Sequence, residues 1–152
     1  MTTTAPLADG RVIGLAHYAG RAVLESVLDR YGVTFQQSVT LRAVAVSGTG
    51  PADRTRLAGE VSDALKIPRA EADGVIDELI AAELLVPHEP SAVRITDAGR
   101  EVYERSSAET GAISARIYSG IPAEDLAVAG RVLTLVTERA DAELAAATGA
   151  VA

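Results

Sequence analysis

Basic side chains gather at two points in the middle of the sequence, each at the expected start of a helix. Arg54 and Arg56 open one amphipathic segment, and Lys66 and Arg69 lie around the start of the next. Cations at such positions can contact duplex phosphates if the helix starts approach DNA, or they can belong to a solvated helix surface. The candidate DNA contacts at the two helix starts are Arg54, Thr55, Arg56, Lys66, Arg69 and Ala70.

Three further residues near this cluster carry groups that could read or hold DNA. Glu71 and Asp73 could each accept a hydrogen bond from the amino group of a cytosine, which would give base specificity. Their alternative role is that of first-turn acids that stabilise the helix dipole. Arg94 lies in an expected strand and could contact a phosphate or the minor groove, or be an ordinary surface residue.

Two helices and a hairpin are expected to position these side chains. The apolar residues of 53–65 recur at spacings of three and four, which predicts an amphipathic helix, and a second helix is predicted over 68–84. Pro68 separates the two and suits the first turn of the second. The β-prone runs 84–86 and 92–95 flank a turn and predict a small hairpin. This order of elements is typical of a winged helix-turn-helix.

Longer helices are predicted on both sides of this segment. One covers 11–31, and a shorter one begins after Thr34, which is expected to form a capping box with Gln37. Beyond the hairpin, Thr96 is expected to cap the first of two more helices within 97–147. Apolar stripes on the outer helices need partners, so we expect 11–31 and 97–147 to pack together and against a second copy.

The predicted fold class follows from these elements. It is mainly α, a winged helix-turn-helix with N- and C-terminal dimerisation helices and a small β-hairpin wing. The chain has 152 residues, of which 48% are hydrophobic, and this is enough for a core. All of 1–152 is expected to form a single domain, with the winged helix-turn-helix lobe at 33–96.

Composition bounds the class of function. The sequence has no cysteine, which excludes disulfides and thiolate chemistry and fits a reducing cytoplasm. It also has no secretory leader pattern and no long apolar run, so we expect a cytoplasmic protein with no membrane partner. There is no glycine-rich phosphate loop and no serine placed beside a histidine and an acid. With only two histidines, His17 and His88, neither a metal site, a cofactor nor an enzyme activity is predicted.

Four segments carry a family resemblance. They are Leu57-Ala58, then Val75-Ile76-Asp77-Glu78-Leu79 with Leu84-Leu85-Val86, then Arg94-Ile95-Thr96-Asp97-Ala98-Gly99-Arg100, and finally Ile121-Pro122-Ala123-Glu124-Asp125-Leu126. In their order and spacing they resemble the multiple-antibiotic-resistance regulator (MarR) family of bacterial transcription factors, over nearly the whole chain. The third segment stands where that family has a strand followed by Leu-Thr-x-x-Gly.

The resemblance implies a function and partners. It implies a homodimer that binds double-stranded DNA at a pseudo-palindromic operator, as a ligand-responsive regulator and most simply a repressor. A small anionic or phenolic effector is expected between the dimer helices and the DNA-binding lobe. The candidate effector contacts are His17, Tyr18, Arg21 and Tyr118.

The charge of the expected recognition helix departs from the family pattern. Residues 68–86 hold one basic and five acidic side chains, a balance of minus four, and the whole chain has a net charge of −7. Gly74 stands where the family has an arginine, and the hairpin keeps only Arg94 of the usual basic residues. Because phosphate neutralisation supplies most non-specific affinity for DNA, an alternative function stays open. It is a ligand-sensing or protein-interaction module of the same fold, with weakened or lost DNA binding.

Overall fold

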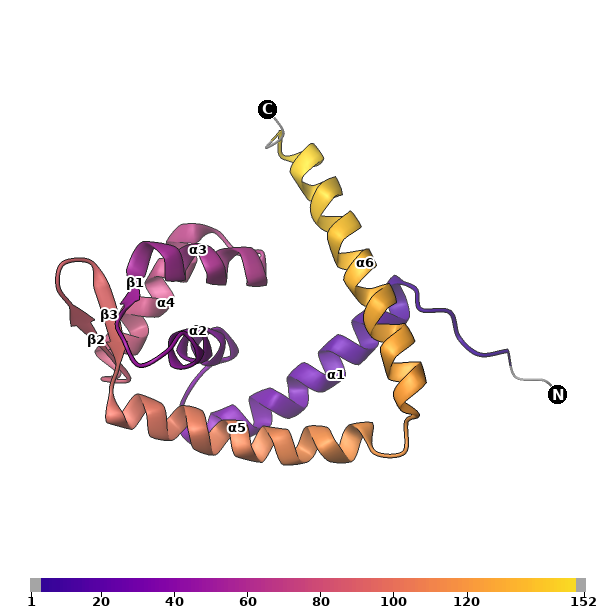
Figure 1. The fold of residues 1–152 in the computed structure, drawn as a ribbon, viewed down its shortest axis with the longest axis horizontal. Coiled ribbons are helices and arrows are strands. Elements are labelled where there is room, and N and C mark those ends of the chain that lie inside the picture. The colour runs from indigo at the N-terminus through magenta and orange to yellow at the C-terminus, as the bar shows by residue number, and fades with distance from the viewer. Residues whose placement is uncertain (1–3, 150–152) are drawn as a thin grey trace. The chain divides into compact units, whose positions relative to one another are not determined.

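Six α-helices and a small antiparallel sheet form the protein in this computed structural model, which describes residues 4–149 (Figure 1). The elements in chain order are α1 (Gly10–Leu28), the short 3-10 helix η1 (Asp29–Tyr31), α2 (Phe35–Val46), β1 (Ala52–Asp53), α3 (Arg54–Leu65), α4 (Arg69–Ala81), β2 (Leu85–His88), β3 (Ala92–Ile95), α5 (Asp97–Tyr118) and α6 (Ala123–Ala147). The predicted mainly α winged helix-turn-helix is therefore confirmed.

The chain divides into two units, Met1–Ala112 and Ile113–Ala152. The first holds α1 to β3 and most of α5, and it contains the helix-turn-helix with its hairpin. The second holds the end of α5 and all of α6. The candidate site lies entirely within the first unit.

The turn between α3 and α4 is built by local hydrogen bonds. Asp53 caps α3, since its carboxylate accepts a bond from the Arg56 backbone N–H at 2.8 Å. At the other end Lys66 takes a left-handed conformation with φ of 55°, and the Ser62 hydroxyl donates to the Ile67 carbonyl at 2.7 Å. Pro68 is the residue before α4 rather than part of its first turn. These bonds fix the angle at which α4 leaves α3.

Helix α4 is shorter than predicted, because it ends at Ala81 and not at Leu84. Glu83 has a φ of 60°, and the Leu84 N–H donates to the Leu79 carbonyl at 3.0 Å. This is the closing pattern that normally uses glycine, and here a glutamate occupies the left-handed position. The prediction was wrong because no sequence signal marks Glu83 as a helix stop.

The sheet has a third strand, β1, which was not predicted from the sequence. The strands are ordered β1, β3, β2, and both pairings are antiparallel. Strand β1 pairs Ala52 with Val93 and Asp53 with Ala92, so the start of α3 is fastened to the hairpin. Strand β2 also begins one residue later than predicted and extends to His88. A strand of two residues leaves no periodic pattern to detect.

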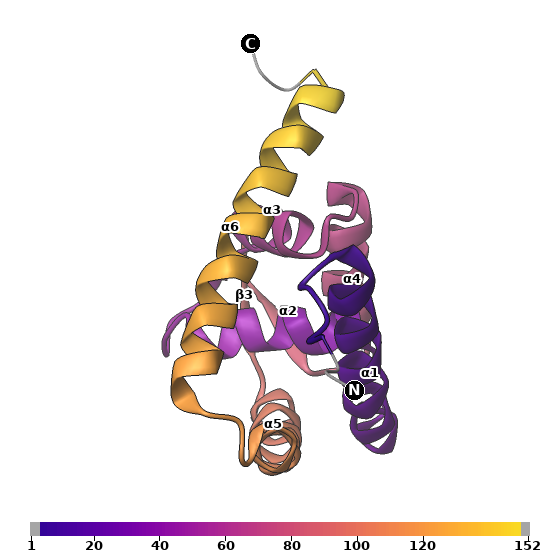
Figure 2. The ribbon, with the colours of Figure 1, turned by 90° about the vertical axis from the view of Figure 1, so that its right-hand side faces the viewer.

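The core of the first unit joins the helix-turn-helix to α2 and the sheet. Helix α2 packs against α3 and α4 (Figures 1 and 2). The buried side chains of this core are Leu41 and Val44 from α2, Leu57, Ala58 and Val61 from α3, Ala72, Val75, Ile76 and Leu79 from α4, and Ala52, Leu85 and Val93 from the sheet. Their burial leaves the opposite face of α4 directed to solvent.

Helix α2 begins as predicted. The Thr34 hydroxyl accepts a bond from the Gln37 N–H at 3.2 Å, and the Gln37 side chain accepts one from the Thr34 N–H at 3.0 Å. The predicted helix over 11–31 is instead α1 followed by η1, and only Val27 and Leu28 of α1 are buried. The guanidinium of Arg30 and the hydroxyl of Tyr31 both bond to Glu109 of α5.

The junction between α4 and α5 is closely packed. Thr96 caps α5, as predicted, by accepting the Gly99 N–H at 3.0 Å. Its own hydroxyl donates to the Glu83 carbonyl at 2.7 Å, and its backbone N–H donates to the Leu84 carbonyl at 3.1 Å. Gly99 is buried against the same Leu84 carbonyl. The end of α4 and the start of α5 are thereby held together.

Candidate nucleic-acid interface

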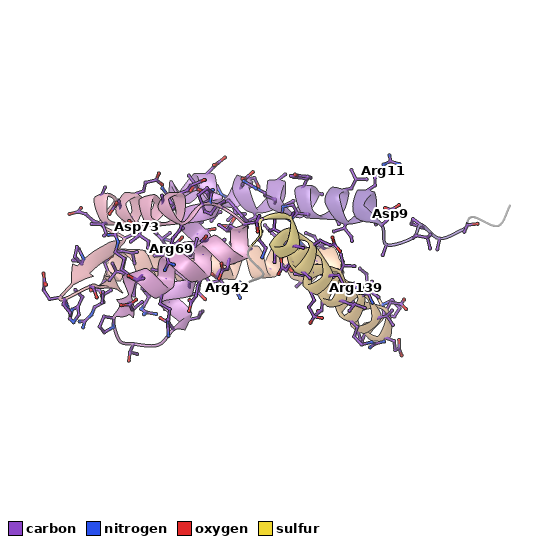
Figure 3. The ribbon with its side chains drawn as sticks, turned by 90° about the horizontal axis from the view of Figure 1, so that it is seen from above. Asp9, Arg11, Arg42, Arg69, Asp73 and Arg139 are labelled. Carbon is purple, nitrogen blue, oxygen red and sulfur yellow. The ribbon has the colours of Figure 1, made fainter. Side chains whose placement is uncertain are left out.

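The starts of α3 and α4 enclose an open depression on the first unit. Its lining residues are Thr55, Ala58, Arg69, Ala70 and Asp73. Arg69 and Asp73 lie near each other at this place, as Figure 3 shows. The structure therefore brings together Thr55, Arg69, Ala70 and Asp73, all of which the sequence singled out.

The side chain of Arg69 extends from the start of α4 and contacts α3. Its Nη2 donates to the Thr55 carbonyl at 2.6 Å, and a side chain at Gly59 would place its Cβ only 3.3 Å from the same nitrogen. The absence of a side chain at Gly59 thus gives the guanidinium room to lie on α3. An arginine has further N–H donors beyond the one used here, so Arg69 can still bind an anion at the rim of the depression.

Arg54 is held within the protein by two acids of α4. Its Nε donates to Asp73 Oδ1 at 2.8 Å, and its Nη2 donates to Asp77 Oδ1 at 2.8 Å and to the Asp73 carbonyl at 3.3 Å. The Arg54 side chain is only 28% exposed, against 49% for Asp73 and 65% for Asp77. The guanidinium expected to reach phosphate is therefore engaged on its own protein, and it ties the start of α3 to the middle of α4.

The contact alters the ionisation of both partners. The hydrogen bond from Arg54 lowers the pKa of Asp73, and the positive charges of Arg54 and Arg69 act in the same direction. The hydrogen bond to Asp73 likewise raises the pKa of Arg54, with a further contribution from Asp77. The pair therefore stays ionised across the physiological range.

A pH dependence of stability follows from the Asp73 shift. A carboxylate whose pKa is lowered in the folded state contributes stability above its unfolded pKa of about 4, and this is lost as pH falls through the folded value. The free energy of unfolding of the wild type should exceed that of Asp73→Asn at pH 7, and the difference should shrink as pH falls below about 4 and through the lowered pKa of Asp73. Urea titrations across this range measure it. A difference that persists in acid would contradict an ionic role for Asp73.

Two other acids of α4 are held by α2. Gln36 Nε2 donates to Glu71 Oε1 at 3.0 Å, and Gln37 Nε2 donates to Glu78 Oε2 at 2.9 Å. Sequence reasoning missed both glutamines as partners of α4, since it considered Gln37 only as a cap. Glu71 is thus both a first-turn acid of α4 and an acceptor from α2, on the opposite flank from Asp73.

The exposed crest of α4 carries small side chains. Positions spaced at three and four residues, opposite the buried Ala72, Val75, Ile76 and Leu79, share one helix face. That crest consists of the exposed Ala70, Asp77 and Ala81 and the half-buried Gly74. Long base-reading side chains such as arginine, asparagine and glutamine do not occur among these four. An alanine methyl can contact a thymine methyl in the major groove, and a small crest lets the helix backbone approach the base edges.

The remaining basic candidates lie on α3, in the turn before α4 and on β3. Arg56 is exposed and pairs with Glu60 at 3.3 Å, one helical turn along α3. Lys66 is exposed in the turn, and Arg94 is exposed on β3, where it pairs in register with Val86. Surface pairs such as Arg56 with Glu60 are weak, so Arg56 can exchange this partner for a phosphate.

Comparison with known proteins adds to this geometry. No family model and no curated protein matches the sequence. Solved structures do match. A MarR family transcriptional regulator from Streptomyces coelicolor has a TM-score of 0.69 at 21% identity, over 86% of this chain and 91% of that one. NadR in complex with 4-hydroxyphenylacetate has a TM-score of 0.68 at 24% identity, over 88% and 98%.

A third match is a complex with DNA. The MarR family protein Rv2887 of Mycobacterium tuberculosis, solved with DNA, has a TM-score of 0.63 at 21% identity, over 88% of this chain and 98% of that one. The chain has the MarR fold. The resemblance found in the sequence is confirmed for the fold, in which α3 and α4 follow one another across the turn at Lys66.

The candidate effector residues fall in both units of the chain. His17 and Tyr18 are exposed on α1 with their rings in edge contact, 5.2 Å between centroids. Arg21 bonds to Glu25 at 2.9 Å and lies over the Phe35 ring, 4.4 Å from its centroid. Tyr118 ends α5 in the second unit and is exposed.

Within residues 4–149, no three His, Cys, Asp or Glu side chains gather closely enough to hold a metal ion. None of the helices in that range is long and apolar enough to cross a membrane.

Proposed function

We propose that this protein is a transcription regulator that binds double-stranded DNA as a homodimer. The observation that carries the proposal is the arrangement of α3, α4 and the hairpin in one unit, with Arg56 on α3, Lys66 in the turn, Arg69 at the start of α4 and Arg94 on β3 all exposed. In helix-turn-helix proteins the second helix enters the major groove, and flanking basic residues bind the backbone. Rv2887, which shares the fold, has been solved in complex with DNA, and this supports DNA as the partner.

Exposed apolar side chains support the homodimer. On α6, Val128, Val132, Leu133, Leu135 and Val136 are each between 39% and 49% exposed. On α1, Leu15 and Tyr18 are more than 60% exposed. Apolar patches of this kind on two helices mark association surfaces. A second copy would cover them and would present two α4 helices to neighbouring half-sites, about 34 Å apart.

DNA binding can be tested directly. The purified full-length protein is titrated into a labelled fragment of its own upstream region at low salt, and binding is followed by fluorescence anisotropy, with sedimentation to establish the oligomeric state. We expect a saturable complex that contains two protein copies. A folded dimer that gives no complex with this or any genomic fragment would contradict the proposal.

Arg69→Ala should weaken this complex. Arg69 lies at the rim of the depression between α3 and α4, so its loss removes one phosphate contact per protomer and raises the Kd about tenfold at low salt. Arg105→Ala is the matched control, because it also removes an exposed arginine, one paired with Glu101 on α5. Equal Kd values for the two variants would exclude Arg69 from the interface.

One observation favours a second function. The crest of α4 is small and carries an aspartate, and the segment 68–86 has one basic and five acidic residues. A surface of this kind suits a protein-interaction module of the same fold that has lost operator binding. The two functions are separated by the same titration, because the module would form its folded dimer and leave DNA unbound.

A small anionic or phenolic effector is proposed as the regulator of DNA binding. The structure of NadR with 4-hydroxyphenylacetate, which shares the fold, supports this class of ligand. Arg21, over the Phe35 ring, offers a cation beside an aromatic surface. A thermal-shift screen of phenolic and aromatic carboxylic acids should find a compound that stabilises the protein and releases DNA. A screen in which no compound does either would count against regulation by this class.

A further inference from the structure

The acidity of α4 poses a physical problem for a helix that enters a groove lined by phosphates. Asp73 and Asp77 are one turn apart on α4, both within reach of Arg54 at the start of α3, and each would repel the DNA backbone at close range. Both of these acids share a single guanidinium. Arg54 reaches them with separate nitrogens, Nε and Nη2, at 2.8 Å each.

The geometry limits what else Arg54 can do. A guanidinium carries five N–H donors in a planar fork, and the hydrogen bonds of Arg54 to two carboxylates and one carbonyl direct its Nε and Nη2 donors at α4. Its side chain is the least exposed of the three, at 28%. A phosphate that approached the remaining nitrogen, Nη1, would lie close to the two carboxylates and be repelled by them, and one that took over Nε or Nη2 would release the acids beside the same DNA.

We infer that Arg54 is a positioning residue for α4: it holds Asp73 and Asp77 against α3 and neutralises part of their charge, so that α4 can approach DNA, and it binds no phosphate itself. This inference rests on the proposed function. It reassigns a residue that the sequence placed among the direct contacts. With Arg54 in place the three side chains carry a net charge of minus one, and without it they carry minus two.

A mutant cycle on the full-length protein tests the inference. Arg54→Met keeps the aliphatic stem and removes the charge, and Asp73→Asn with Asp77→Asn removes both acids while keeping their shape. The wild type, these two proteins and the triple variant are titrated into the same DNA at low salt. We expect Arg54→Met to raise the Kd about tenfold in the wild type and by less than about threefold in the double-Asn protein.

The outcomes separate a positioning role from a contact. If Arg54 bound a phosphate, Arg54→Met would weaken binding by the same factor in both backgrounds, and this would overturn the inference. A merely structural role would also fail to show rescue, because removing the acids would not repair a loosened fold. Arg105→Met, which leaves Glu101 without its partner, should change the Kd less than about twofold and controls for loss of charge.

A second measurement keeps the test valid if Arg54→Met does not fold. With Arg54 intact, the double-Asn protein should bind DNA several times more tightly than the wild type, because two negative charges are removed. Weaker binding would mean that the acids orient Arg54 onto a phosphate, and this would overturn the inference. If the wild type itself binds no DNA, the proposed function fails together with the inference, whereas failure of the cycle alone leaves the proposed function intact.

Discussion

Gly99→Ala should destabilise the protein by about 3 kcal/mol, at the upper end of overpacking changes. A Cβ built on Gly99 would lie 2.1 Å from the Leu84 carbonyl oxygen, a backbone atom that has little freedom to move. That carbonyl also accepts the Thr96 N–H, so a shift would weaken the joint between α4 and α5. Urea unfolding followed by circular dichroism measures the change, and DNA affinity should fall with it because α4 loses its support.

The same substitution at Gly111 provides the control. Gly111 lies in α5 as well, and an added Cβ there would meet nothing within 4 Å. Alanine has the higher helix propensity, so Gly111→Ala should leave stability unchanged or raise it by up to about 1 kcal/mol. If the two variants had the same free energy of unfolding, the close approach of Gly99 to Leu84 would not contribute to stability.

Gly99 also illustrates what the sequence could predict. The Thr-x-x-Gly pattern indicated a helix start from local chemistry, and Thr96 caps α5 as expected. The capping box of Thr34 with Gln37 and the break at Pro68 were predictable for the same reason, since each depends on residues a few positions apart. Apolar periodicity then placed the helices of the winged helix-turn-helix in the right order.

Features that depend on distant residues were not predictable in this way. Arg54 pairs with acids 19 and 23 positions further along the chain, and only the packing of α3 on α4 brings them together. The spacing of four residues between Asp73 and Asp77 places both on one face of α4, but it does not identify Arg54 as their partner. Strand β1 and the helix stop at Glu83 likewise arise from the surrounding fold and leave no local signal.

The affinity for DNA should fall about ten-thousandfold when the salt concentration rises from about 50 to about 200 mM. Arg56, Lys66, Arg69 and Arg94 offer four candidate phosphate contacts per protomer, or eight in a homodimer. Each contact releases counterions and contributes a slope of about −0.9 to log K against log salt, so eight predict a total of about −7. Anisotropy titrations at four or more salt concentrations, roughly spanning that interval, give the slope.

The slope also measures how many basic residues of each protomer contact DNA. If Arg54 were a fifth contact, ten phosphates per dimer would steepen the slope to about −9, whereas a positioning role leaves it near −7. Arg69→Ala should flatten it by about two, one contact from each protomer, and Arg105→Ala should not change it. A slope close to zero would mean that any complex forms without phosphate contacts. The acidic segment 68–86 would then be a protein-binding surface, and α4 would not be a DNA-reading helix.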